Sequence, residues 1–386
     1  MKREVLRRAR ADIERAATGE LAWMDFAAAA SEAIRRVVPF DRACWHPVDP
    51  GTCLFTGGLG QNIVCSGPWL AEYEYVVDDV NKWSALARSD QRAGSLSEAT
   101  HGDLLRSART RSSIELGMPV GDELRVSVVA DGTYWAAAGL LRDPESPWFT
   151  QEEVRFLASL SSVLAEGFRR AMVRVAVTDD PTGAPGVLVM DEDGGVESIS
   201  PAAKQWLDEL LETPSPPEPH QARVVQAVAA RARAHSSGGV SGARARVQTR
   251  SGRWLLLYAT PLAAGAQSRV AVIIQPAGLH DIAPLVAQAY GLSARERDVT
   301  RLCVQGLPTK EIAASLHISP YTVQDHLKSI FDKTGTRSRA ELVGQVFLEH
   351  YVPRWEELGD LPGGWNVQAI DTASTAGSAH QQRGTY

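Results

Sequence analysis

The sequence predicts a multidomain protein in which two α+β domains precede an all-α four-helix domain. A length of 386 residues suits two or three domains of roughly 150 residues each, and 44% hydrophobic residues are enough for separate cores. β-rich runs meet at Asp131-Gly132 and again at Asp193-Gly194, which predicts two hairpins far apart in the chain. Helix start and stop signals gather near the C-terminus. The predicted boundaries are 1–178, 183–278 and 286–350, followed by a disordered tail at 352–386.

The first domain is predicted to begin with two helices. Apolar residues at helical spacing in a charged segment predict one helix that ends at Gly19, and an alanine-rich helix follows over 21–38. Short β-rich runs come next, and residues 124–141 form the clearest hairpin. Thr150-Gln-Glu-Glu153 is a capping box that opens a long amphipathic helix to about Val177. Helices around an antiparallel sheet indicate an α+β domain.

The second domain repeats this mixture on a smaller scale. A hairpin surrounds Asp193-Gly194, and a short helix starts at Pro201. The later β-like runs are 243–250, 254–262 and 270–275. The order predicts a second α+β unit of about a hundred residues. From about residue 353 the chain is rich in Gly, Ser, Thr and Gln, which predicts the disordered tail.

The C-terminal domain carries the most explicit helix signals. Ser293-Ala-Arg-Glu296 is a capping box, and Gly306 ends that first helix. Thr309 is the expected cap of a second helix, and Ser319-Pro320 is a cap and first-position pair for a third. Gly335 stops the third helix before a fourth begins. The tight connection between the second and third helices predicts a helix-turn-helix.

The third of these helices, over about 320–334, separates into two faces. Val323, Leu327 and Ile330 fall on one side and are expected in the core. The polar side carries Tyr321, Gln324, Asp325, Lys328 and Asp332. In the major groove of DNA, Gln can pair with adenine, Asp can accept from cytosine N4, and Lys can donate to guanine. Helix periodicity alone is equally consistent with a plain four-helix bundle whose polar face is solvated.

The residues themselves favour the first interpretation. The motifs are Leu292-Ser-x-Arg295-Glu296, Gly306-Leu-x-Thr309-Lys310-Glu311-Ile312-Ala313, Ser319-x-x-Thr322-Val323-Gln324-x-His326-Leu327-x-x-Ile330-Phe331-x-Lys333-Thr334-Gly335 and Arg337-x-Arg339. They resemble the LuxR-type helix-turn-helix domain over nearly its whole length. The resemblance implies a transcription regulator that binds double-stranded DNA, usually as a homodimer, with RNA polymerase as a further expected contact. It implies base reading by Gln324, Asp325 and Lys328. The expected phosphate contacts are Lys310, Tyr321, Thr322, Arg337 and Arg339.

Charge leaves a second function class open. The chain has a formal net charge of −6, which excludes a protein that coats nucleic acid along its whole length. Residues 290–347 carry eight Lys and Arg against six Asp and Glu, so this segment is only slightly basic. An acidic Asp325 beside Gln324 removes positive charge from the groove face. The alternative is therefore a protein-interaction scaffold whose helix-turn-helix no longer reads DNA.

The two N-terminal domains resemble sensor modules in the order of their elements. Residues 20–175 resemble a GAF domain, and residues 183–278 resemble a PAS-like domain. The resemblance implies control of activity by a small-molecule effector or by dimerisation. The aromatic residues expected to line a ligand pocket are Trp45, Trp69, Tyr73, Tyr75, Trp83 and Trp135. The alternative interpretation is ordinary aromatic packing in a small core.

Several functions lack their sequence signals. The chain has no P-loop, no nucleophile elbow and no kinase ATP-binding motif, so we expect no enzyme activity. The four cysteines show no metal-ligand spacing, and we expect no metal and no cofactor. No apolar run approaches the roughly 20 residues of a membrane span, and the N-terminus lacks a secretion signal. The expected location is the cytoplasm.

Overall fold

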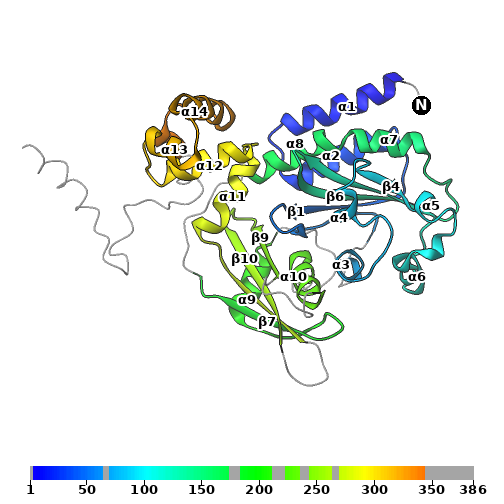
Figure 1. Cartoon of the computed structure of the whole chain (residues 1–386). Helices are drawn as coiled ribbons and strands as arrows, with labels where there is room; N and C mark the ends of the chain where they lie inside the picture. Colours follow the sequence, from blue (N-terminus) through cyan, green and yellow to red (C-terminus); the bar gives the residue numbers. More distant parts are fainter. Residues whose placement is uncertain are drawn as a thin grey trace, which may run out of the picture.

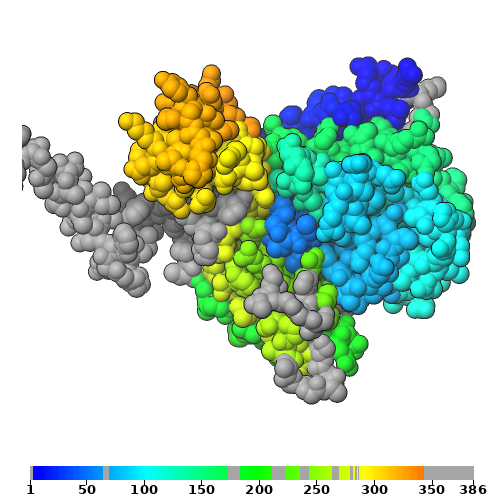
Figure 2. Space-filling view, in the orientation of Figure 1, coloured from blue at the N-terminus to red at the C-terminus, as the bar shows by residue number. Residues whose placement is uncertain are grey.

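The computed structural model describes residues 3–63, 69–173, 183–210, 222–234, 243–262 and 269–343. The disordered tail predicted at 352–386 lies outside these residues. Figure 1 shows two sheets, one above the other, with the C-terminal helices at one side. Figure 2 shows the same arrangement as a surface, with the C-terminal domain (yellow to orange) at the opposite end from the cyan part of the first domain.

The first domain is built on a six-stranded antiparallel sheet. Its strands are β1 (Arg42–Asp49), β2 (Leu54–Phe55), β3 (Leu59–Gln61), β4 (Ala93–Ser95), β5 (Asp122–Ala130) and β6 (Thr133–Arg142). Their order is β2-β1-β6-β5-β4, and β3 also pairs with β1. The predicted hairpin is confirmed: β5 and β6 meet at Asp131 and Gly132, which both have positive φ.

Helices cover both faces of this sheet. They are α1 (Arg3–Thr18), α2 (Trp23–Arg35), α3 (Trp69–Tyr75), α4 (Trp83–Leu86), α5 (Leu96–Ala99), α6 (Ala108–Glu115), α7 (Gln151–Ser159) and α8 (Ser161–Val173). On one face, α2 and α8 pack against the sheet, and α1 packs on α2 and α8 (Figure 1). Trp45, Leu124 and Phe168 belong to the core of this layer.

The prediction of one long helix after Thr150 is wrong in one respect, because the structure has two helices there, α7 and α8. The capping box is confirmed, since the Thr150 hydroxyl accepts from the backbone N–H of Glu153 and the Glu153 carboxylate accepts from that of Thr150. The break lies at Leu160. The Ser161 hydroxyl after it accepts from Val129 N–H at 2.9 Å, at the point where the register of β5 and β6 shifts. This contact between Ser161 and β5 lies at the junction of α7 and α8, and a helix pattern in the sequence does not reveal it.

The second domain has a five-stranded antiparallel sheet. Its elements are β7 (Gly186–Met190), β8 (Val196–Ile199), α9 (Pro201–Asp208), α10 (Arg223–Ala234), β9 (Ala243–Gln248), β10 (Trp254–Leu262) and β11 (Arg269–Pro276). The strand order is β8-β7-β11-β10-β9. The hairpin predicted around Asp193-Gly194 is confirmed, as are the helix at Pro201 and the three later strands.

The two domains share one hydrophobic core. Helix α10 of the second domain packs between its own sheet and the α3 and β2 elements of the first (Figure 1). Phe55 and Trp83 from the first domain lie in the same buried cluster as Val225, Val228 and Leu255 from the second. Because neither set is exposed, the domains pack as parts of one body rather than as separate units.

Helix α11 (Leu279–Ala289) leads from β11 into the C-terminal domain. Near its start, the Asp281 carbonyl accepts from Arg246 Nη1 at 2.9 Å. At its end, the Ala289 carbonyl accepts from Arg169 Nη1 of α8 at 2.8 Å. Ile282 and Leu285 are buried with the core of the C-terminal domain, so α11 contacts all three domains.

The C-terminal domain contains α12 (Ala294–Val304), α13 (Thr309–Leu316), α14 (Pro320–Thr334) and α15 (Arg339–Val343). The four helices match the four predicted. Helix α14 packs on α12 and α13. In Figure 1 it lies on the side of this domain that faces away from the second sheet.

Candidate nucleic-acid interface

Local signals at both ends fix the length and direction of α14. The Ser319 hydroxyl accepts from Thr322 N–H at 3.1 Å, and Pro320 occupies the first helical position. Gly335 ends the helix with φ of 72°, a conformation that favours glycine. At the other end, His317 has φ of 54° and ends α13, which leaves a short turn between α13 and α14. This geometry confirms the predicted helix-turn-helix arrangement.

One predicted cap is wrong. Thr309 was expected to cap α13, but Pro308 is the residue before the helix and Thr309 is its first helical residue. The Thr309 hydroxyl instead accepts from Arg339 Nη2 at 2.9 Å. A contact with a residue 30 positions along the chain therefore takes the place of the local one.

The buried side of α14 is the one expected from the sequence. Val323 and Ile330 are fully buried and Leu327 nearly so, in one cluster with Ile312 and Val299. Packing of this apolar side against α12 and α13 orients the helix, so the opposite side faces outward.

The outward side carries the predicted base-reading residues. Gln324, Asp325 and Lys328 are all exposed, and Tyr321 is 80% exposed. Within the part of the chain that the structure describes, the side chains of Gln324, Asp325 and Lys328 make no hydrogen bond or ion pair. Their donor and acceptor groups are therefore available to a partner.

A buried carboxylate joins the start of α12 to the end of α14. Glu296 accepts from Lys333 Nζ at 2.7 and 2.9 Å, from the Ser329 hydroxyl at 2.7 Å and from Ser293 N–H at 2.6 Å. Burial opposes its charge, but these hydrogen bonds outweigh that effect and lower the pKa of Glu296 to about 2. The capping box was found from the sequence. The Lys333 and Ser329 contacts were not, because they join residues more than 30 positions apart.

The predicted phosphate-contacting residues differ in how free they are. Lys310 and Arg337 are exposed, and no contact of either side chain is recorded among the described residues. Thr322 is half-buried, with its hydroxyl 2.9 Å from that of Ser319. The Arg339 guanidinium donates to the Leu307 carbonyl at 3.1 Å and to Thr309, so it ties α15 to the turn before α13.

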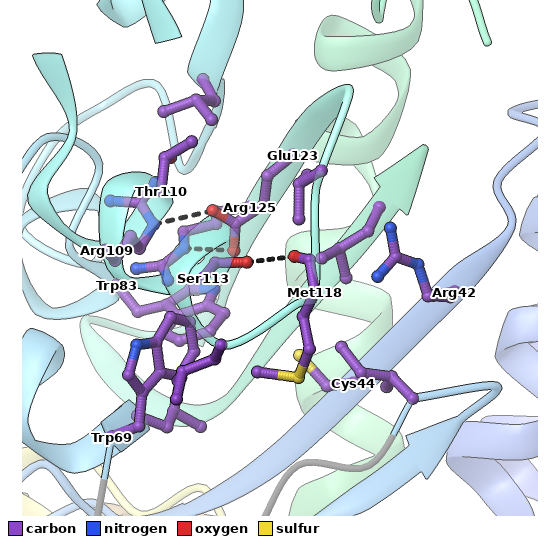
Figure 3. A pocket seen from close by; sticks show the side chains of 16 residues that line it. Arg42, Cys44, Trp69, Trp83, Arg109, Thr110, Ser113, Met118, Glu123 and Arg125 are labelled. Atoms are coloured by element: carbon purple, nitrogen blue, oxygen red, sulfur yellow. Dashed lines mark hydrogen bonds and ion pairs between the residues drawn. The ribbon is translucent and has the colours of Figure 1, made fainter. Parts of the chain in front are cut away.

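The six aromatic residues predicted to line a pocket do not lie together. Trp45 and Trp135 belong to the core between the first sheet and its helices. Only Trp69 and Trp83 line a cavity on the opposite face of that sheet (Figure 3). Because side chains alternate along β1, Trp45 points away from the cavity, to the face opposite that of Cys44. Tyr75 and Tyr73 make other contacts, with the hydroxyl of Tyr75 accepting from Phe55 N–H and the ring of Tyr73 tilted 5.5 Å from that of Trp69.

The described residues contain neither a metal cluster nor a helix that could span a membrane. No cluster of three or more His, Cys, Asp or Glu side chains there could hold a metal ion. None of the helices described combines the length and apolarity needed to cross a membrane.

Comparison with known proteins gives matches to the C-terminal domain. The family model described as "Bacterial regulatory proteins, luxR family" matches residues 291–346. The putative HTH-type transcriptional regulator Mb0914c of Mycobacterium bovis is 47% identical over 61 residues, which are 16% of this chain and 7% of that protein. The spore germination protein GerE of Bacillus subtilis is 44% identical over 55 residues, 14% of this chain and 74% of GerE.

The likeness outside that domain is weak. The chain spans only 7% of the length of the first relatives that it matches. Among solved structures, the match to the bacteriophytochrome RpBphP3 from R. palustris covers 72% of this chain and 63% of the bacteriophytochrome chain, at 14% identity and a TM-score of 0.30.

Proposed function

Because this chain belongs to the LuxR family of bacterial regulatory proteins, we propose that it regulates transcription by binding specific sequences in double-stranded DNA through α14. The major groove is about 12 Å wide and admits one α-helix. In this proposal the N-terminal half of α14 enters the groove, and the packed side described above holds it at a fixed angle.

The exposed and unpaired face of α14 carries the proposal. Gln324, Asp325 and Lys328 present an amide, a carboxylate and an ammonium group, which suit adenine, cytosine and guanine respectively. Since these groups have no partner among the described residues, binding DNA costs no internal bond. Reading three different bases requires this mixture of charge, so the acidic Asp325 fits specific recognition.

The phosphate contacts follow from exposure. Lys310, Arg337 and Tyr321 lie near helix starts with their side chains exposed, and Thr322 lies in the first turn of α14. We assign these four to the DNA backbone. Arg339 is assigned to positioning, because its guanidinium holds the turn before α13. Its effect on phosphate binding then comes through Lys310 on the adjoining helix.

The first two domains supply the regulation in this proposal, as GAF-like and PAS-like sensors of a small effector. Their shared core and the bonds at both ends of α11 support it, since a change in either domain reaches the helix before α12. We also propose a homodimer on DNA, because one small domain reads few base pairs and two half-sites need two copies. A contact with RNA polymerase belongs to the same proposal.

The test is a binding titration of the full chain against genomic DNA fragments at several salt concentrations. We expect a small set of retained fragments, and an affinity that falls linearly with the logarithm of salt concentration because released counterions drive binding. Retention of no fragment at low salt, or an affinity that does not depend on salt, would contradict the proposal. The scaffold alternative is not favoured, since the matching relatives are named as transcriptional regulators.

A further inference from the structure

A cavity of about 80 Å³ lies under the first sheet, on the face opposite α2 and α8 (Figure 3). Most of its wall is apolar. The apolar side chains that line it include Leu70, Leu96, Val120, Leu141, Trp69 and Trp83. Two other hollows lined by described residues are more open depressions. An enclosed apolar cavity with a few polar groups is the usual form of a small-molecule site.

One wall of the cavity is charged. Glu123 lies between two arginines, with 2.8 Å from its carboxylate to Arg109 Nε and 2.8 Å to Arg125 Nε (Figure 3). Burial opposes the charge of Glu123, but the two guanidinium groups hold its pKa at about 2. The guanidinium of Arg125 also stacks 3.8 Å above the ring of Trp83. The wall is therefore preorganised and stays ionised.

This wall has an unused hydrogen-bond donor. The Arg109 side chain is only 3% exposed, and its Nε and Nη1 donate to Glu123 and to the Val80 carbonyl. Its Nη2 is buried and has no hydrogen-bond partner in the described part of the chain. Arg42 belongs to the same lining, and its Nε is likewise buried without a hydrogen-bond partner among the described residues. Buried guanidinium donors without acceptors are costly, so an acceptor placed here is stabilised.

The charges of the lining favour an anion. Three guanidinium groups and one carboxylate belong to it, those of Arg42, Arg109, Arg125 and Glu123. The other acidic partners of these arginines, Asp79, Glu74 and Asp143, approach from outside the lining. A bidentate acceptor suits the fork of a guanidinium group.

A surface depression adjoins the cavity. An open depression of about 500 Å³ shares Arg42, Ile63 and Met118 with the cavity lining. Met118 is half-buried, and its side chain is flexible and unbranched. Met118 is therefore the shared side chain whose movement would let a ligand pass from the depression to the cavity.

We propose that the cavity binds a short-chain aliphatic carboxylate of roughly four to six non-hydrogen atoms. The carboxylate accepts from Arg109 Nη2, and the chain lies against Leu70, Leu96 and Val120. The claim that this carboxylate acts as an effector rests on the regulatory function proposed above. The claim that the cavity binds it does not, because binding is measured without DNA.

The test is ligand-observed NMR titration of the full chain with butyrate and with butyramide, its neutral counterpart of equal size. We expect saturable binding of butyrate and at least tenfold weaker binding of butyramide. Arg109→Lys keeps the charge but loses the free Nη2, and we expect it to bind butyrate at least tenfold more weakly. Arg142→Lys is the matched control, because Arg142 in β6 is another buried arginine and is paired with Glu153 outside the cavity. It should stay within twofold of the original chain.

A second variant keeps the proposal falsifiable if Arg109→Lys does not fold by circular dichroism. Val120→Phe fills the cavity from a half-buried position and should abolish butyrate binding. Absence of saturable butyrate binding, equal binding of butyramide, or unchanged binding by folded Val120→Phe each overturns the proposal. These results leave the DNA titration untouched, so failure of the ligand site and failure of the regulator proposal are distinguishable.

Discussion

The carboxylate of Asp49 in β1 accepts three hydrogen bonds from Arg246 in β9, 197 residues along the chain. Backbone N–H donates at 2.9 Å, Nε at 3.0 Å and Nη2 at 2.6 Å. The Asp49 side chain is fully buried and that of Arg246 is 11% exposed. The pair thus joins the first domain to the second in a largely buried site.

Arg246→Met should destabilise the contact between the first two domains by about 3–5 kcal/mol, because it leaves the Asp49 charge buried without its partner. Hydrogen exchange of the amides in β1 and β9 measures the loss. Arg244→Met is the control, an exposed arginine on the same strand, and should change exchange by less than about 0.5 kcal/mol. Adding Asp49→Asn to Arg246→Met should restore part of the loss. No recovery would mean that the lost stability is not electrostatic.

The C-terminal domain should lose stability in acid through Glu296. Its pKa of about 2 when folded lies below the ordinary value of 4.5, so its stabilising effect is complete above about pH 4.5 and is lost as pH falls toward 2. We expect Glu296→Gln to lower the stability of α12 and α14 by about 1–3 kcal/mol at pH 7, and by less than half as much at pH 3. Hydrogen exchange of these helices at both pH values checks this. Glu311→Gln, an exposed glutamate of α13, should have no comparable effect, and a Glu296→Gln loss of equal size at both pH values contradicts the assignment.

Lys328→Ala should weaken binding to the specific DNA site by about 1–3 kcal/mol and relax the preference at one base position. The measurement is a titration against the best genomic fragment and against variants of it at each position. Lys204→Ala on α9 removes a lysine distant from α14 and should leave binding unchanged. Equal weakening by Lys328→Ala on specific and random DNA would refute base reading by this residue.

Arg337→Ala and Arg339→Ala should separate backbone binding from positioning. Arg337→Ala should weaken binding to all sequences alike, with little change in stability. Arg339→Ala should destabilise the turn before α13 by about 1–2 kcal/mol even without DNA, since two hydrogen bonds from a charged donor are lost. Hydrogen exchange at residues 305–309 and a DNA titration report the two effects. If Arg339→Ala weakens DNA binding while exchange stays unchanged, Arg339 contacts phosphate directly.

The chain should be a dimer when bound to DNA. Sedimentation of the full chain with a fragment containing two half-sites about one helical turn apart should give two protomers per duplex. Moving one half-site by about five base pairs should reduce affinity, because the second recognition helix then faces the wrong side of the duplex. A single protomer on both fragments would be incompatible with the dimer.

Sequence patterns predicted the C-terminal domain well because its signals are local. Ser293 and Ser319 cap their helices within three residues, and the buried side of α14 follows from periodicity alone. The hairpin at Asp131-Gly132 is local in the same sense. Thr309 was misassigned because its partner, Arg339, lies in another helix.

The arrangement of the first two domains could not be predicted in this way. The pairing of Asp49 with Arg246 leaves no periodic trace, because each residue is one polar position in an otherwise ordinary strand. The pocket prediction grouped Trp45 with Trp83 by composition. The face on which Trp45 lies follows from the alternation of β1, but which of its two faces α2 and α8 cover could not be predicted from the sequence alone.

Both ends of α11 are held by arginines from different domains, Arg246 at Asp281 and Arg169 at Ala289. A rotation between the first two domains therefore cannot leave α11 in place without breaking one of these bonds. In a dimer, the separation of the two α14 helices is then a property of the first two domains and not of the helix-turn-helix. If the protein binds DNA as the proposed dimer, its preferred operator spacing depends on residues far from the proposed base-reading ones, and it changes when the first two domains move.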